Sequence, residues 1–387
     1  MPPVGAKRLW VYVVALAMKL LALQYEHFRN LAQVTLEPSA HATIAVGENG
    51  QGKTNLLEGL YFLATLKPLR AGKLAELVAF GAPGARVTGR FLLQGAEREI
   101  AVDILPTGRT AFVDGKRAPS LDAYFGGVSV VAFTPDDLAV VRGGPDGRRA
   151  FLDRSVFNRF PAFLDESREY ARALKSRNRL LKDHAPVSHL QAWDATLARV
   201  GARLWVRRRA LMDELSTRAA TAFQRIGRTV APAVFDYQPS HLKDVVFATA
   251  TEAELQQALL GRLDERLPRD LERGFTSVGP HADDLDISLG EHGARQYASQ
   301  GQSRALVLAW KVAEIENLQA SNGFLPLLLL DDVSSELDPE RNAFLMGYLA
   351  DSGAQTFLTT TDRAFVERAS GADSRWLKVR AGEVTAL

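Results

Sequence analysis

The sequence predicts an α/β fold that is interrupted by an inserted, mainly helical lobe. Near the N-terminus, a short apolar segment, a glycine-rich loop and a segment with helical spacing follow one another between residues 43 and 66. A block with helical periodicity occupies residues 146–227. Apolar segments that end in polar residues return at 324–332 and 355–362. This order predicts a sheet built from two separated pieces of chain, with the helical block inserted between them.

Before the glycine-rich loop, residues 21–25, 34–36 and 44–46 are expected as strands around a turn at 28–30. After it, 86–93, 99–105 and 110–113 are expected as strands, and Asp114-Gly115 closes the last of them as a hairpin turn. Residues 128–133 have the composition of a buried strand, and the next residues predict a helix with Thr134 as N-cap and Pro135 in its first turn.

The helical block is expected to break at Pro161 and Pro186, and a further helix at 252–273 is expected to end at Gly274. Residues 284–289 then predict a strand, and a polar turn at 297–302 opens a long helix over 303–317. The expected organisation is an N-terminal extension (1–17), a first α/β part (18–142), a helical lobe (143–278) and a second α/β part (279–387).

The composition is that of a soluble globular protein. Of the 387 residues, 47% are hydrophobic and 24% are charged, and none is cysteine. The absence of cysteine excludes disulfides, thiolate metal sites and a cysteine nucleophile, and it suits a cytoplasmic location. The seven histidines have no metal-binding spacing, so no zinc site is expected.

The net charge of +2 is unevenly distributed. Residues 142–228 contain 19 Lys and Arg but 9 Asp and Glu, a balance of +10. The remainder contains 28 basic and 36 acidic residues, a balance of −8. A basic lobe on an otherwise acidic protein suggests an anionic polymer as partner.

Residues 1–17 contain Lys7-Arg8 and an apolar run that resembles a signal peptide. The run breaks at Lys19, which leaves it too short for a transmembrane helix, and no membrane association is expected. Met18 is a second plausible start. We therefore expect an extension that is dispensable or results from a mis-assigned start, with an export signal as the less favoured alternative.

The glycine-rich loop matches G-x-x-x-x-G-K-[ST] at every position, between a predicted strand and a predicted helix. Its backbone N–H groups are expected to cradle phosphate oxygens, while Lys53 reaches the β- and γ-phosphates and Thr54 ligates Mg2+. A chance glycine turn is the alternative, and the flanking elements argue against it. The expected nucleotide-binding residues are Gly47, Glu48, Asn49, Gly50, Gln51, Gly52, Lys53, Thr54 and Asn55.

An apolar segment ends at Asp331 and Asp332. Alone this pattern is weak, because any strand can leave the core at an acidic residue. Downstream of a phosphate loop it predicts that Asp331 holds Mg2+ through water and that Asp332 orients or deprotonates the attacking water. Asp332 and the phosphate-contacting Lys53 are the expected catalytic residues.

Ser299, Gln300, Gly301 and Gln302 precede a long helix and suggest a second anion site, although an ordinary capped helix start explains the same residues. The order of phosphate loop, helical insert, Ser-x-Gly-Gln helix, acidic strand and the D-loop segment with Ser335 and Asp338 resembles the ABC-type ATPase head. That resemblance implies that the signature of one subunit completes the ATP site of another. A two-fold, ATP-dependent homodimer is therefore expected.

Several further segments resemble the RecF family of bacterial recombination-mediator ATPases, relatives of SMC heads. They are the segments at 28–30, 47–58, 133–138, 279–281, 298–302 and 328–333. The resemblance implies weak, DNA-stimulated ATP hydrolysis with Mg2+, and binding to duplexes, single-strand gaps and single-strand/double-strand junctions. It also implies cooperation with RecO and RecR to load RecA, and roles in replication restart and the SOS response.

The chain departs from these family patterns at a few positions. Thr361 stands where many ABC ATPases have a switch histidine, and Asp332 replaces the commoner glutamate. Ala282 follows 279–281 where the family has arginine, and Asp136 is the only substitute for a missing Q-loop glutamine. The first two changes are compatible with slow turnover.

Most arginines of the basic block are expected to solvate exposed helices. The tightest clusters, Arg148, Arg149, Arg207, Arg208 and Arg209, are the first candidates for contact with DNA phosphates. Aromatic residues are sparse among them, which argues for sequence-independent backbone binding. A transporter ATPase and a chromosome-organising clamp remain as alternatives; the first would usually keep the switch histidine, and the second needs sustained heptads that are absent here.

Overall fold

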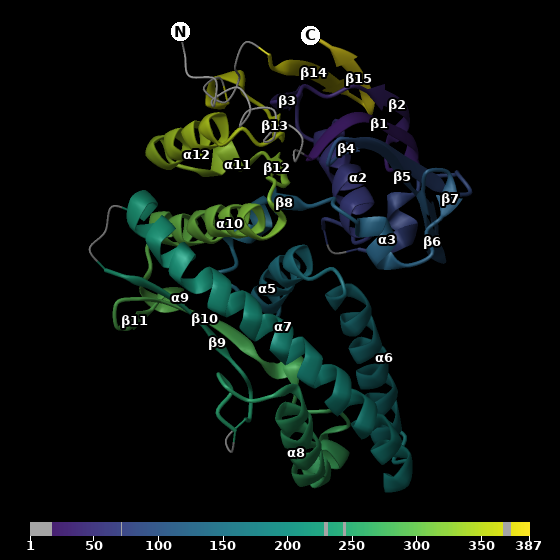
Figure 1. Cartoon of the computed structure of the whole chain (residues 1–387), viewed down its shortest axis with the longest axis vertical. Coiled ribbons are helices and arrows are strands. Elements are labelled where there is room, and N and C mark those ends of the chain that lie inside the picture. Colours follow the sequence, from purple (N-terminus) through teal and green to yellow (C-terminus); the bar gives the residue numbers. More distant parts are fainter. Residues whose placement is uncertain (1–17, 71, 228–230, 243–244, 367–372) are drawn as a thin grey trace. The chain divides into compact units, whose positions relative to one another are not determined.

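The computed structural model describes residues 18–70, 72–227, 231–242, 245–366 and 373–387, so the predicted N-terminal extension lies outside the described residues. The chain forms two compact units (Figure 1). Unit 1 contains the residues up to Leu138 and those from Glu314 onward, and unit 2 is Ala139–Ala313. The sequence placed the return to the α/β part at 279. Residues 279–313 instead group with unit 2, because their strand β10 pairs with β9 of that unit.

Unit 1 contains a six-stranded antiparallel sheet. Its order is β2 (Leu31–Leu36), β1 (Met18–Phe28), β4 (Ala85–Leu93), β5 (Ala96–Leu105), β6 (Gly108–Val113) and β7 (Lys116–Arg117). Burial alternates along β4, as expected for a sheet with one covered face. Asp114 and Gly115 both have positive φ, 49° and 74°, which a type I′ hairpin turn requires.

The second sheet of unit 1 carries the phosphate loop. Its order is β15 (Glu383–Ala386), β14 (Arg375–Arg380), β3 (Ala42–Val46), β13 (Thr356–Thr360), β12 (Leu327–Asp331) and β8 (Val130–Phe133). All pairs are parallel except β14–β15. The carboxyl ends of β3, β12 and β13 therefore meet at one edge of the sheet, where ligands bind in open α/β sheets.

The helices of unit 1 connect or cover these sheets. Helix α2 (Lys53–Thr65) starts at the phosphate loop and contacts β12 and β13. The others are η1 (Leu74–Leu77), α3 (Leu121–Phe125), α4 (Pro135–Leu138), α11 (Val333–Glu336), α12 (Pro339–Ser352) and η3 (Arg363–Phe365).

Unit 2 is mainly helical and confirms the two predicted proline breaks. Its elements are α5 (Pro145–Arg159), α6 (Phe163–Lys182), α7 (Val187–Gly227), α8 (Glu252–Arg273), η2 (Pro280–Ala282), α9 (Ala294–Tyr297) and the start of α10 (Gln300–Asn322). Helices α6 and α7 lie side by side (Figure 1). A small sheet, β11 (His292–Gly293), β10 (Asp284–Leu289) and β9 (Ala233–Gln238), completes the unit. In the described part of the chain, none of the helices has the length and the apolar composition that crossing a membrane requires.

Buried ion pairs join the helices of unit 2. The Arg177 guanidinium is fully buried and donates to Asp194 Oδ1 at 2.6 Å, Asp270 Oδ2 at 2.8 Å and Thr276 Oγ1 at 2.9 Å. These contacts tie α6 to α7, to α8 and to the segment that follows α8. The guanidinium is thus part of the core, where a charge is tolerated only when it is paired.

Some local predictions need correction. The Thr134 hydroxyl does not cap α4; instead its backbone N–H donates to Asp137 Oδ2 at 3.0 Å. The long helix expected from 303 begins three residues earlier, at Gln300, because the polar turn itself is helical. Strand β12 begins at Leu327 rather than at 324.

Candidate nucleoside-triphosphate site

The phosphate loop joins β3 to α2, and its glycines adopt conformations that other residues rarely take. Gly50 and Gly52 have φ of 80° and 113°. A Cβ on Gly52 would also lie 2.7 Å from Asn30 Oδ1. Asn30 Nδ2 donates to Gln51 O at 3.1 Å, so the turn at 28–30 supports the loop from the side. The sequence predicted that turn but gave Asn30 no role in the site.

The C-terminal hairpin also supports the loop. The N–H of Gly382 donates to Gln51 O at 2.9 Å, and the N–H of Ala381 donates to Gln51 Oε1 at 2.7 Å. A Cβ on Gly47 would come within 2.4 Å of Val379 O, so only glycine fits there. Gln51, which was predicted to bind nucleotide, therefore has a structural contact through both its backbone and its side chain.

Lys53 is held inside the loop, and no carboxylate of the described residues lies at hydrogen-bond distance from it. Its Nζ donates to Gly47 O at 2.6 Å and to Glu48 O at 2.9 Å. Burial lowers the pKa of Lys53, and the charges of Asp332 and Asp331 only partly offset this effect. A cation that is paired mainly with neutral carbonyls is poised for an incoming polyphosphate.

Thr54 and Asp331 are in direct contact at the edge of the sheet. The Thr54 hydroxyl donates to Asp331 Oδ1 at 2.7 Å, and the Thr359 hydroxyl donates to the same oxygen at 2.9 Å. Arg70 Nη2 lies 3.8 Å from Asp331 Oδ2. The contacts of Thr359 and Arg70 were not predicted, since neither residue belongs to a recognisable motif.

This donor set fits Mg2+. A hydroxyl and a carboxylate are hard oxygen ligands, and Mg2+ in nucleotide sites usually takes one or two such ligands and completes its shell with water and phosphate oxygens. No group of three or more His, Cys, Asp or Glu side chains that could hold a metal occurs among the residues described.

Asp332 follows at the mouth of the site. It has φ of 50°, and its N–H donates to Thr359 Oγ1 at 3.0 Å, which fixes the turn after β12. A pocket of about 280 Å³ opens here. It is lined by Asn49, Gly50, Gly52, Lys53, Thr54, Asn55, Arg70, Asp331 and Asp332. The structure thus brings together both predicted carboxylates and most of the predicted phosphate loop.

The residues predicted for a trans contact belong to unit 2. Ser299 caps α10: its Oγ accepts from the Gln302 N–H at 3.1 Å, while Gln302 Oε1 accepts from the Ser299 N–H at 2.8 Å. This reciprocal arrangement is a capping box. Ser299 and Gln300 are exposed. The ordinary capped start is therefore present in the structure, and a signature role stays a prediction.

Four other predicted positions cap a helix, lie within one or are exposed. Asp338 caps α12 by accepting from the Arg341 N–H at 3.1 Å; although burial opposes the shift, these bonds and the Arg341 charge lower its pKa. Ser335 lies within α11. Thr361 follows β13 and is exposed, and Asp136 is exposed in α4.

The predicted DNA-contacting arginines are mostly used inside unit 2, which corrects the sequence interpretation. Arg148 donates to Asp284 Oδ1 and Oδ2 at 2.7 and 2.6 Å and is buried. Arg208 is 3% exposed and donates to Asp153, Tyr237 and the Pro280 carbonyl. Neither guanidinium is available to a phosphate.

The other three candidates also have partners within the protein. Arg149 donates to Asp283 O, Arg207 to the Glu166 carboxylate, and Arg209 to the carbonyls of Phe247 and Ala250. Adjacent arginines on one helix point to different sides, so a cluster in the sequence need not be a cluster on the surface.

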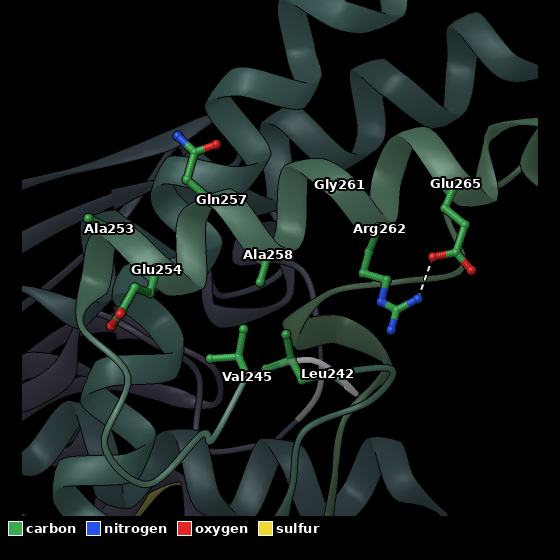
Figure 2. A pocket seen from close by; sticks show the side chains of 9 residues that line it. All are labelled: Leu242, Val245, Ala253, Glu254, Gln257, Ala258, Gly261, Arg262 and Glu265. Atoms are coloured by element: carbon green, nitrogen blue, oxygen red, sulfur yellow. Dashed lines mark hydrogen bonds and ion pairs between the residues drawn. The ribbon is translucent and has the colours of Figure 1, made fainter.

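A larger pocket, about 570 Å³, lies in unit 2 between α8 and the loop before it. Figure 2 shows Leu242 and Val245 of the loop facing Ala258 of α8, with the Arg262–Glu265 ion pair at one end. This lining has neither a glycine-rich loop nor paired carboxylates. Size alone therefore does not identify the nucleotide site.

Comparison with known proteins agrees with the geometry. The family model described as "RecF/RecN/SMC N terminal domain" matches residues 19–383. "DNA replication and repair protein RecF" of Myxococcus xanthus (strain DK1622) is 69% identical over 95% of this chain and 97% of that protein. The protein of the same name from Geobacter sp. (strain M21) is 40% identical over 95% and 100%.

Solved structures give the same result. "Structure of the recombination mediator protein RecF-ATPrS in RecFOR pathway" matches with a TM-score of 0.85 at 30% identity, covering 96% of this chain and 99% of that one. An SMC head bound to the C-winged helix domain of ScpA matches with a TM-score of 0.54 at 17% identity and 95% and 97% coverage. The latter shows a shared fold only, in agreement with the predicted ATPase head.

Proposed function

This chain belongs to the RecF family, and from that premise we propose that it is an ATP-binding DNA replication and repair protein whose ATP-dependent dimer binds DNA. The observation that carries the proposal is the contact of Thr54 with Asp331 beside Lys53 at the mouth of the phosphate loop. Solved RecF structures named with ATP and with ATPrS support the choice of nucleotide.

The residues of the site have different roles in binding and hydrolysis. The loop N–H groups and Lys53 bind the phosphates, and Thr54 and Asp331 hold Mg2+. Bound Mg2+ supplies charge neutralisation between the β- and γ-phosphates. Asp332 orients the attacking water or accepts its proton. Its side chain is one methylene shorter than the commoner glutamate, which agrees with slow hydrolysis used as a switch.

The dimer is proposed because each chain contains only one copy of each motif that a complete ATP site needs. One chain has one phosphate loop, at 47–54, and one candidate signature, at Ser299–Gln302. The exposed N-terminus of the 23-residue helix α10 offers backbone N–H groups to an anion. In a two-fold dimer, this helix of one protomer would complete the ATP site of its partner, with Ser335 and Asp338 in the facing D-loop.

The proposed partners of this chain are those expected for the RecF family. DNA with single-strand gaps and single-strand/double-strand junctions is the proposed substrate, and DNA is proposed to stimulate the ATPase. The RecFOR pathway named for the relatives supports RecO and RecR as partners in loading RecA, with roles in recombinational repair and the SOS response. A cytoplasmic location is part of this proposal.

Sedimentation velocity with Mg-ATP, with and without a gapped duplex, tests the proposal. We expect a dimer with ATP and a monomer with ADP, and Lys53→Met should remain monomeric because its phosphate contact is lost. Asp332→Asn is the matched control: it should keep the ATP dimer while hydrolysis stops. A wild-type monomer under all conditions, with no duplex binding, would refute the proposal.

A further inference from the structure

The solvent-facing side of α6 carries five basic residues in a row. Arg168, Arg172, Lys175, Arg179 and Lys182 follow one another at spacings of four, three, four and three residues. With 3.6 residues per turn, all five lie within about 80° around the helix axis. The buried residues Tyr170, Ala173, Arg177 and Leu181 of α6 lie on the opposite side. We call the five exposed-side residues the α6 stripe.

The stripe is not matched by the acidic residues of its own helix. Glu166 and Glu169 face α7, where their carboxylates pair with Arg207 at 3.3 Å and Arg199 at 2.5 Å. Within the ranges that the structure describes, the α6 stripe itself is paired with only one exposed carboxylate near each of its ends. Asp165 lies 3.4 Å from Arg168, and Asp183 lies 3.6 Å from Arg179.

The other members of the stripe have no carboxylate within ion-pair distance among the described residues. Arg172 reaches only the Arg168 carbonyl, at 3.5 Å, and Lys175 and Lys182 are exposed. Arg168 has a buried Nη2 without an acceptor in the same part of the chain. Burial and the charge of Arg172 together lower the pKa of Arg168, so like charges do act on one another here.

Like charges three and four residues apart destabilise a helix, and here four such pairs follow in sequence. An ordinary solvated face intersperses both signs and avoids this cost. The arrangement therefore favours a bound polyanion, which would remove the repulsion and replace it with attraction.

We propose that the α6 stripe binds the phosphate backbone of duplex DNA. From Arg168 to Lys182 the stripe spans 14 residue steps, or about 21 Å of helix axis, which corresponds to about six base pairs at 3.4 Å per step. The stripe includes no aromatic side chain that could stack on a base, so a duplex fits better than a single strand. It includes no apolar side chain either, which disfavours insertion into a membrane.

This proposal deepens the proposed function and rests on it, because it assumes that the protein binds DNA. The test uses the full chain with Mg-ATP and a 30-bp duplex, with the dissociation constant measured at several KCl concentrations. The variant Arg172→Gln/Lys175→Gln/Lys182→Gln removes three unpaired charges and keeps good helix formers. Arg90→Gln/Lys116→Gln/Arg117→Gln removes the same charge from the antiparallel sheet of unit 1.

Each phosphate contact contributes about 0.9 to the slope of log K against log salt concentration. The α6 variant should therefore lose about 2.7 from this slope, while the control variant keeps the wild-type slope. The α6 variant should also melt at the same or a higher temperature than the wild type, since repulsion is removed. A purely structural role for these residues would lower the melting temperature instead.

The outcomes separate the two proposals. An unchanged slope in the α6 variant, or an equal loss in the control variant, overturns the assignment of the stripe but leaves DNA binding intact. Wild-type protein that does not bind the duplex overturns the proposed function itself. Wild-type binding to phosphatidylserine vesicles that is lost in the α6 variant, with duplex binding unchanged, would assign the stripe to a membrane surface and overturn the DNA assignment.

Discussion

Helices α6 and α7 lie side by side and both contain many arginines, but they use them differently. On α7, Arg199, Arg203 and Arg207 pair with glutamates of neighbouring helices, and Arg208 is enclosed by buried partners. On α6, only Arg177 is used in this way, and the solvent side keeps the α6 stripe.

The difference shows that the excess charge of a segment does not locate its binding surface. Residues 142–228 carry a balance of +10, and the densest run of arginines, Arg207 to Arg209, lies on α7. Yet α6 supplies two of the carboxylates that neutralise α7, at Glu166 and Glu169. The basic excess is therefore left on α6. Which surface can attract an anion depends on which basic side chains lack a paired carboxylate, and the number of basic residues in a segment does not determine it.

The largest expected effect is on stability, at Arg208. Arg208→Met should lower the free energy of unfolding of unit 2 by about 3–5 kcal/mol, because it leaves buried Asp283 without a compensating charge. Urea unfolding followed by tryptophan fluorescence measures this loss. Arg203→Met, at an exposed ion pair of 3.2 Å with Glu252, is the matched control and should change little. Equal effects in both variants would contradict the distinction between arginines that are paired inside the fold and arginines that are exposed to solvent.

Two arginines on α6 provide a closer contrast. Arg177→Met should cost about 3 kcal/mol, since Arg177 is fully buried between Asp194 and Asp270. Arg179→Met, two residues later and 84% exposed, should stay within about 0.5 kcal/mol of the wild type. Thermal and urea denaturation of both variants measure the difference. Similar losses would mean that α6 does not separate a structural side from a binding side.

A smaller, pH-dependent effect is expected at His281. Its ring nitrogens lie 2.8 Å from the Tyr170 hydroxyl and 2.9 Å from the Thr276 carbonyl. Burial lowers the pKa of His281 below its ordinary value of 6.5; the Thr276 bond opposes the shift, and the charges of Arg149 and Arg208 add to it. The folded state thus favours the neutral ring, and its contribution to stability is complete above pH 6.5 and is lost as pH falls.

The unfolding midpoint of the wild type should therefore decrease between pH 7.5 and pH 5.5. His281→Gln cannot take up the proton and should show a smaller decrease over the same range. Parallel pH profiles for the two proteins would show that another group, rather than His281, controls the acid sensitivity.

The smallest effect is expected at Arg207. Its guanidinium lies 3.3 Å from Glu166 in a partly exposed pair, and such pairs contribute about 0–1 kcal/mol. Arg207→Gln should change stability within that range and leave the salt dependence of duplex binding unchanged. A loss of about 0.9 in the salt slope would instead make Arg207 a phosphate contact and break the proposed distinction between α6 and α7.

Most of unit 1 could be predicted from the sequence because its signals are local. The spacing of Gly47, Gly52, Lys53 and Thr54 encodes a backbone conformation, and the apolar run before Asp331 encodes a buried strand. The contacts of Asn30, Arg70 and Thr359 could not be predicted in this way. Each is made with a residue far away in the chain, and no single-residue pattern marks such a contact.

Less of the helical unit 2 could be predicted from the sequence. Proline breaks and capping residues predicted α5 to α8, but β9 was missed, and its partner β10 was assigned to the other part of the chain. In unit 1, by contrast, strands β14 and β15 and helix α12 were missed. Arg148 and Arg208 were misjudged because burial depends on packing between distant segments, which a run of basic residues does not reveal.

The position of β3 in its sheet has a consequence for the order of folding during synthesis. Strand β3 is complete by Val46, yet its two neighbours are β13 and β14, about 310 or more residues later in the chain. The contacts that hold Gln51 come from Ala381 and Gly382, later still. The ribosome thus releases the phosphate loop early but the C-terminal part of its support last. The growing chain cannot assemble this nucleotide site until its final strands are available, so long-range pairing delays it.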